Sequence, residues 1–233
     1  MGILRRMTFD RRVAVFSTAL SAFFAFSGET KATIIAPGPG AFPPDIFSLS
    51  GTTLLASVTS PNVVALGGGF TSTVTAAVYS DPANVFGAGD LDFVYQITNS
   101  PSSADAIGRV TGVNFTGFST DVGFVVNGGS LPGGLFVDGT VSPQLVDRVS
   151  ADVVGFSFNA PSTNPISPGQ TSTVLVIETN ATNFTAGNVN LIDGDVSRVA
   201  AFQPTAIPEP ASLTLLSIGI GFVAFAGVAR KSR

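Results

Sequence analysis

The stretch Leu91-Asp-Phe-Val-Tyr-Gln-Ile-Thr98 has the clearest strand pattern in the sequence. Its large apolar residues Phe93, Tyr95 and Ile97 occupy every second position, and smaller or polar residues lie between them. Successive side chains of a strand point to opposite faces of its sheet. This period of two therefore predicts a strand that is half-buried, with one face against a core.

Similar short runs recur on both sides of this stretch, at residues 53–58, 72–79, 110–115, 122–126, 153–158 and 173–179. The segments between them contain Ser-Asp-Pro, Asn-Gly-Gly, Pro-Gly-Gly and Ser-Pro-Gly, which are typical of turns. The chain has 26 Gly, and no convincing helical pattern lies outside its two ends. We therefore expect an all-β fold, an antiparallel β-sandwich, over residues 33–206.

The composition excludes several kinds of chemistry. The chain has no Cys and no His, which removes thiol nucleophiles, disulfides, imidazole bases and the zinc or haem sites built on those ligands. Between residues 33 and 206 only three basic residues accompany twelve acidic ones, a net charge of −9. A negatively charged domain repels phosphate backbones, so we do not expect it to bind nucleic acid.

Two places offer oxygen ligands of the kind that Ca²⁺ prefers. Asp90 and Asp92 form one pair, and Asp193 and Asp195 close the run Asn-Val-Asn-Leu-Ile-Asp-Gly-Asp at residues 188–195. Neither place has the spacing of an EF-hand loop, and turns favour the same residue types. We expect no cofactor, and Ca²⁺ binding at these residues is the alternative.

Other local patterns are weaker. The acceptor pattern for N-glycosylation occurs at Asn114, Asn180 and Asn183, although a Thr-rich chain produces it by chance as well. A serine hydrolase without His would need an unusual base, which leaves a carboxylate pair such as Asp138 with Asp152 as the formal route to catalysis. The chain has no Trp and no Asp-Thr-Gly motif, and we expect it not to be an enzyme.

The N-terminal segment has the pattern of an export signal. An uncharged, mostly apolar stretch of 14 residues, 13–26, follows four arginines, Arg5, Arg6, Arg11 and Arg12. A basic region before an apolar core of this length is typical of a secretory signal peptide, and the core is short for a membrane span. We expect residues 1–32 to direct the chain into the general export machinery and to be removed by signal peptidase. An uncleaved anchor is the alternative.

The C-terminal segment, residues 207–233, has three parts. Pro208, Glu209 and Pro210 come first, and the uncharged stretch 211–229 follows. As a helix its 19 residues would be about 28 Å long, close to the thickness of the hydrocarbon layer. Basic residues complete the segment: Arg230, Lys231 and Arg233. By the positive-inside rule these residues stay in the cytoplasm and leave the β-domain outside.

This order of tripeptide, apolar stretch and basic cluster resembles the PEP-CTERM sorting signal of Gram-negative bacteria, whose substrates are handled by exosortase. The resemblance implies that Pro208, Glu209 and Pro210 are read by an exosortase-like membrane enzyme. It also implies transient anchoring in the inner membrane, with the passenger domain in the periplasm, and then delivery to the cell surface or the extracellular space. Bacteria with such proteins often make exopolysaccharide.

The resemblance covers about 27 residues and assigns no activity to the passenger domain. We favour a structural surface or matrix protein that is associated with exopolysaccharide. The alternatives are a calcium- or glycan-binding module, or a carboxylate-dependent hydrolase without a recognisable motif.

Overall fold

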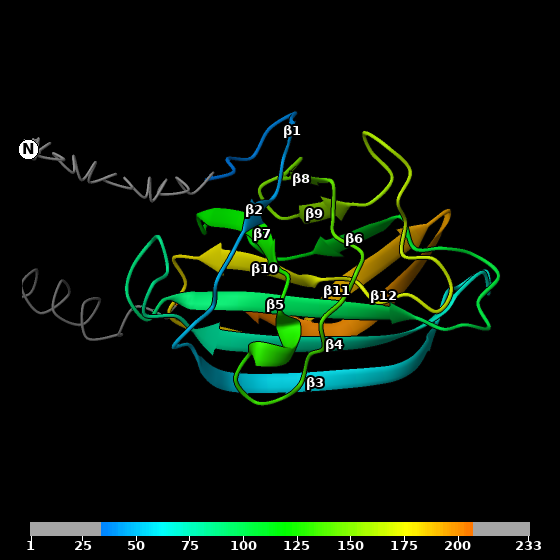
Figure 1. The fold of residues 1–233 in the computed structure, drawn as a ribbon. Helices are drawn as coiled ribbons and strands as arrows, with labels where there is room; N and C mark the ends of the chain where they lie inside the picture. The colour runs from blue at the N-terminus through cyan, green and yellow to red at the C-terminus, as the bar shows by residue number, and fades with distance from the viewer. Residues whose placement is uncertain (1–33, 207–233) are drawn as a thin grey trace, which may run out of the picture. The chain divides into compact units, whose positions relative to one another are not determined.

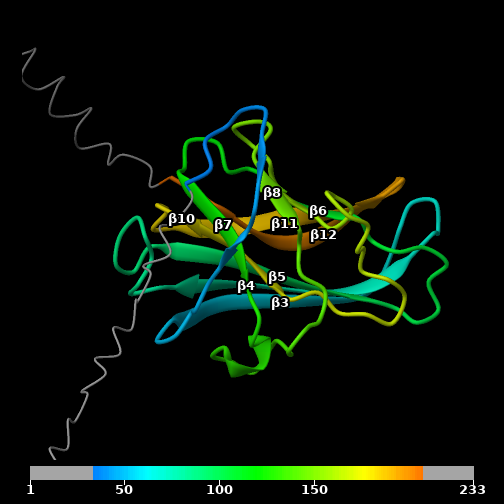
Figure 2. The ribbon, with the colours of Figure 1, turned by 45° about the horizontal axis from the view of Figure 1, so that its top comes forward.

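The computed structural model describes residues 34–206, which form two stacked six-stranded β-sheets (Figures 1 and 2). The first sheet has the order β2 (Asp45–Ile46), β7 (Thr120–Val125), β10 (Val174–Thr179), β5 (Leu91–Asn99), β4 (Thr71–Ser80), β3 (Thr53–Val64). The second has the order β1 (Ala41–Phe42), β8 (Leu145–Asp147), β9 (Val154–Ser157), β6 (Arg109–Gly112), β11 (Phe184–Asp193), β12 (Asp195–Pro204).

The pairing of strands confirms the expected sandwich. Every pair of named strands within residues 34–206 is antiparallel except β2 with β7, which is parallel. All seven stretches in which the sequence predicts a strand contain one, although the strand expected at residues 110–115 ends at Gly112. The long hairpin of β11 and β12 was not predicted.

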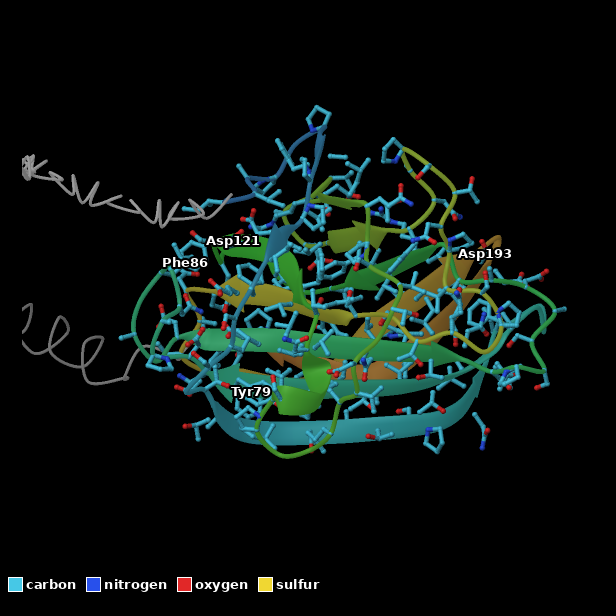
Figure 3. All side chains as sticks on the ribbon, viewed as in Figure 1. Tyr79, Phe86, Asp121 and Asp193 are labelled. Atoms are coloured by element: carbon cyan, nitrogen blue, oxygen red, sulfur yellow. The ribbon has the colours of Figure 1, made fainter. Side chains whose placement is uncertain are left out.

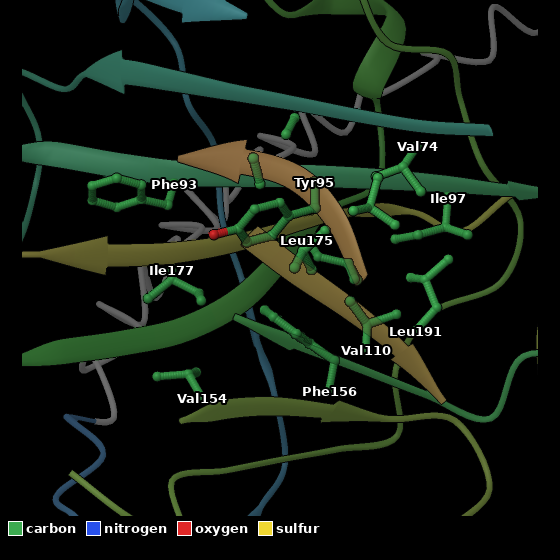
Figure 4. Packing of buried hydrophobic residues seen from close by; sticks show 14 of the residues in the cluster. Val74, Phe93, Tyr95, Ile97, Val110, Val154, Phe156, Leu175, Ile177 and Leu191 are labelled. Atoms are coloured by element: carbon green, nitrogen blue, oxygen red, sulfur yellow. The ribbon is translucent and has the colours of Figure 1, made fainter. Parts of the chain in front are cut away.

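The main core lies between the two sheets. Phe93, Tyr95 and Ile97 of β5 point into this layer (Figure 4), as their alternation predicts, and each is at most 1% exposed. Phe93 packs edge-on against Phe115, with ring centroids 5.6 Å apart. The second sheet contributes Phe156 and further apolar residues of β6, β9, β11 and β12 to the same cluster.

A second apolar cluster covers the outer face of the first sheet. Tyr79 and Val94 pack there against Leu131 and Phe136 from the connection between β7 and β8. This connection includes the short 3₁₀ helix η1 (Gly128–Ser130), which lies in front of the sheet in Figure 1. The Tyr79 hydroxyl donates a 2.7 Å hydrogen bond to the Pro132 carbonyl. Both faces of β5 are therefore buried, so the expectation of a half-buried strand is wrong.

The expected signal peptide (residues 1–32) and the C-terminal sorting segment (residues 207–233) lie outside the described residues. Within residues 34–206, no helix has the length and apolar character needed to cross a membrane.

Candidate functional site

Three acidic residues form a row across the first sheet. In the register of its strands, Asp121 of β7 is opposite Glu178 of β10, and Glu178 is opposite Asp92 of β5. Residues opposite each other in antiparallel strands point to the same face, so the three side chains share the outer face. Tyr79 of β4 continues the row beyond Asp92. The sheet therefore places like charges side by side, an arrangement that is unfavourable without compensation.

The loop between β4 and β5, residues 81–90, covers this end of the sheet. Asp81 follows β4 directly, and its Oδ1 accepts a 2.8 Å hydrogen bond from the backbone N–H of Ala83. Asn84 Nδ2 donates to Asp92 Oδ1 at 2.9 Å, and the backbone N–H of Val85 donates to Glu178 Oε2 at 3.4 Å. The loop thus binds to the acidic row through N–H donors and adds a further carboxylate to it.

Asp81, Asp92 and Glu178 form a compact group, which we call the acidic triad. One carboxylate oxygen from each lies within 4.8 Å of those of the other two. The three residues are 2%, 0% and 6% exposed, so the group is closed to a large substrate. Asp92 Oδ2 is buried and receives no hydrogen bond from the described residues.

Burial and neighbouring charges raise the pKa values of Asp92 and Glu178. Burial, with the charges of Glu178 and Asp81 and a side-chain hydrogen bond with Asp81, raises the pKa of Asp92 from 3.8 to about 9, although the hydrogen bond from Asn84 opposes this rise. Burial also raises the pKa of Glu178 from 4.5 to about 7, and the charges of Asp121, Asp81 and Asp45 add to the rise. The N–H of Val85 lowers the pKa of Glu178 in part.

No basic side chain neutralises the triad within residues 34–206. The ion pair of this part of the chain joins Arg109 to Asp147 at 2.6 Å, in the second sheet. Arg148 is buried and donates hydrogen bonds to neutral oxygens, among them Thr120 Oγ1 at 3.2 Å. The triad can lower its charge by keeping protons, or it can hold a cation, since carboxylate oxygens are the ligands of Ca²⁺ and Mg²⁺.

Ca²⁺ binding by the pairs Asp90 with Asp92 and Asp193 with Asp195 stays a prediction. Asp92 belongs to the triad, but Asp90 lies outside it, and its carbonyl accepts a 3.1 Å hydrogen bond from the Asp81 N–H. Asp193 and Asp195 flank Gly194 in the β11–β12 hairpin, at the opposite end of the sandwich from Phe86 of the β4–β5 loop (Figure 3). Burial and the charge of Asp105 raise the pKa of Asp193.

Sequence reasoning missed Asp81 and Glu178. Asp81 stands in a Ser-Asp-Pro turn, where an acidic residue is ordinary. Glu178 was more informative, because it ends the apolar run Val-Leu-Val-Ile, where a charged residue needs a partner when it is buried.

The remaining candidates occupy the surface or loops. Asn114, Asn180 and Asn183 are all exposed, and their use as glycosylation sites stays a prediction. Asp138 is exposed and accepts a 2.9 Å hydrogen bond from the Gly129 N–H, at η1 over the first sheet. Asp152 lies between β8 and β9 of the second sheet, so the two carboxylates considered for catalysis belong to different layers.

Comparison with known proteins defines the class of the chain through its C-terminal segment. Residues 206–231 match the PEP-CTERM protein-sorting motif, an interval that contains Pro208, Glu209 and Pro210. The chain therefore carries the signal of an exported, cell-surface-associated protein. It is marked as a substrate of exosortase. No curated protein and no solved structure matches the chain.

Proposed function

We propose that the chain is an exported cell-surface or extracellular-matrix protein whose β-sandwich is a non-enzymatic structural domain. The observation that carries this proposal is the sorting motif at residues 206–231. In this account, residues 211–229 hold the exported chain in the inner membrane, with Arg230, Lys231 and Arg233 on the cytoplasmic side. An exosortase-like enzyme then reads Pro208, Glu209 and Pro210 and cuts the chain near them.

The position of the motif relative to the fold supports this order of events. β12 ends at Pro204, and the matched interval begins at residue 206. A cut at the motif therefore leaves all the described strands, and both apolar clusters, in the released part of the chain. The passenger loses no part of its described core when it is separated from the membrane segment.

Two features of residues 34–206 favour a structural passenger over an enzyme. The acidic triad is buried, so its carboxylates do not face a large substrate. A cavity of about 570 Å³ lies between residues 46–51 and the start of the β7–β8 connection, and its lining includes Phe47, Leu49, Val125 and Leu131. None of its lining side chains is ionisable, so this cavity lacks the groups for acid–base catalysis.

We further propose that the passenger associates with exopolysaccharide. The chain is poor in charge, and residues 34–206 expose many Ser, Thr and Asn side chains, whose hydroxyl and amide groups exchange hydrogen bonds with sugars. Retention of the purified domain on exopolysaccharide from the producing cells, and its elution by free polysaccharide, would support this association. Equal retention on an unrelated, uncharged polymer would contradict it.

Expression of the full chain in a bacterium with exosortase, and in the same strain without the enzyme, tests the sorting part. We expect a shortened passenger outside the membrane fraction only when the enzyme is present. Release of the same product in both strains would contradict the proposal.

A further inference from the structure

We propose that Asp81, Asp92 and Glu178 bind one Ca²⁺ ion, which fastens the β4–β5 loop to the outer face of β5 and β10. This inference does not depend on the sorting function. It concerns a site inside the passenger domain, away from the segment that is processed.

The spacing of the triad fits one ion. Protein oxygens bind Ca²⁺ at about 2.3–2.6 Å, so two oxygens on the same ion lie no more than about 5 Å apart. The three carboxylate oxygens of the triad are within 4.8 Å of one another. They come from a loop, a strand start and a strand end, and an ion between them would join all three segments.

The hydrogen bonds leave the triad with capacity to bind a ligand. Asp92 uses Oδ1 to accept from Asn84, whereas its Oδ2 is buried without a donor from the described residues. A buried carboxylate oxygen without a partner is costly, and a cation satisfies it more strongly than a neutral donor does. The site thus has an unsatisfied buried oxygen in addition to a cluster of acids.

The charge around the triad also favours a divalent cation. The strand register and the β4–β5 loop bring the carboxylates of Asp81, Asp92 and Glu178 together. No arginine of residues 34–206 forms an ion pair with this group. One Ca²⁺ would neutralise two of the carboxylate charges of the triad. It would thereby stabilise the like charges that the strand register places side by side.

Ca²⁺ fits the site better than Mg²⁺. Ca²⁺ accepts irregular sets of oxygen ligands, whereas Mg²⁺ requires near-octahedral geometry and retains its water. The triad supplies ligands from an irregular loop and is closed to bulk water. Extracellular proteins bind Ca²⁺ with dissociation constants of about 10⁻⁴–10⁻³ M, which matches a site with few carboxylates.

Thermal unfolding of the full chain, purified in a non-ionic detergent, tests the proposal. When CaCl₂ replaces EDTA at about 100 times the dissociation constant, we expect the midpoint to rise by roughly 5–10 °C. Asp92→Asn and Glu178→Gln should abolish this rise. Asp90→Asn is the matched control, because it removes a carboxylate from the same loop but outside the triad, and it should keep the full rise.

Terbium luminescence provides a second measurement. The chain has two Tyr and no Trp, and Tyr79 stands opposite Asp92 in the neighbouring strand. Excitation of tyrosine should therefore sensitise Tb³⁺ bound at the triad, and CaCl₂ should displace it. Glu178→Gln should remove the saturable signal. Because this measurement uses the parent chain and Glu178→Gln, it tests the proposal even if Asp92→Asn fails to fold.

The proposal is overturned if the parent chain shows neither a Ca²⁺-dependent midpoint nor a saturable, Ca²⁺-displaced Tb³⁺ signal. It is also overturned if the triad variants keep the same Ca²⁺ response as the parent, or if Asp90→Asn alone removes it. An equal rise with MgCl₂ would contradict the assignment to Ca²⁺. If Asp92→Asn stabilises the chain and the parent does not respond to Ca²⁺, the triad is neutralised by a proton on Asp92 and not by a cation.

Discussion

Glu178 of β10 and Asp92 of β5 lie directly opposite each other in adjacent strands, and both are buried on the covered outer face of the first sheet. Two carboxylates in this position repel each other when both are charged. The fold therefore depends on what neutralises them, and this relationship determines how the domain responds to pH and to changes in the β4–β5 loop.

In EDTA, we expect the domain to become less stable as the pH rises from 5 to 9. Burial, together with the charges of Asp121, Asp81 and Asp45, raises the pKa of Glu178 to about 7. Burial, together with the charges of Glu178 and Asp81, raises the pKa of Asp92 to about 9. Between pH 4.5 and these values, the folded chain keeps protons that the unfolded chain has lost. The free energy of unfolding therefore falls as the pH rises.

Urea unfolding at pH 5, 7 and 9 measures this dependence. Asp92→Asn should make the profile flatter, because the amide does not titrate. A parent profile that rises steadily from pH 5 to pH 9 would contradict the assignment of raised pKa values to this pair.

Asn84 should be important for the stability of the β4–β5 loop. Its Nδ2 donates to Asp92 Oδ1 and to the Thr179 carbonyl, and its Oδ1 accepts a 2.9 Å hydrogen bond from the Phe86 N–H. Asn84→Ala leaves these partners unsatisfied, and Asp92 and Thr179 among them are buried, so we expect the free energy of unfolding to fall by about 1–3 kcal/mol. Denaturant unfolding measures the change. The exposed Asn183→Ala is the control and should stay within about 0.5 kcal/mol of the parent.

Phe93 tests the core between the sheets. It is fully buried and packs edge-on against Phe115. Phe93→Ala should lower the free energy of unfolding by about 3–5 kcal/mol, through lost burial and the cavity that remains. The exposed Val137→Ala, measured by the same denaturant titration, should have little effect. Equal losses from both substitutions would contradict the two-layer core.

The mature N-terminus should lie between residues 28 and 33. Ile35 is 1% exposed, and its N–H donates a 2.9 Å hydrogen bond to the Thr120 carbonyl, so a later cut would remove a buried contact of the sandwich. Mass spectrometry of the exported protein identifies the first residue. A mature chain that still carries Arg11 and Arg12 would show that the segment is an anchor.

The sequence predicted the sandwich but not all of its strands. β5 follows a clear alternation of Phe93, Tyr95 and Ile97, whereas β11 contains Gly, Ala and Asn, which have low strand propensity. β11 exists because it pairs along its whole length with β12 and buries Val189 and Leu191. Their alternation on one side of the Asp-Gly-Asp turn was a usable signal for a hairpin.

The acidic triad was less accessible to sequence reasoning. Asp92 stood out through its neighbour Asp90, which does not belong to the triad. The pairing of β4, β5 and β10 brings Asp81 and Glu178 next to Asp92. These strands are distant in the chain, so the spacing of residues in the sequence does not predict their register.

The substitution Glu209→Ala in a host with exosortase tests most directly whether Pro208, Glu209 and Pro210 act as a sorting signal. Glu209 is the only charged residue between Arg198 and Arg230, and an apolar stretch of unchanged length should still insert. Thr205→Ala, a neutral change just before the motif, is the matched control. Gel mobility and fractionation of parent, variant and control measure processing.

We expect the Glu209→Ala chain to remain full-length in the membrane fraction, whereas the parent and Thr205→Ala are shortened and released. Processing and release of Glu209→Ala at the parent level would contradict the sorting role of Pro208, Glu209 and Pro210.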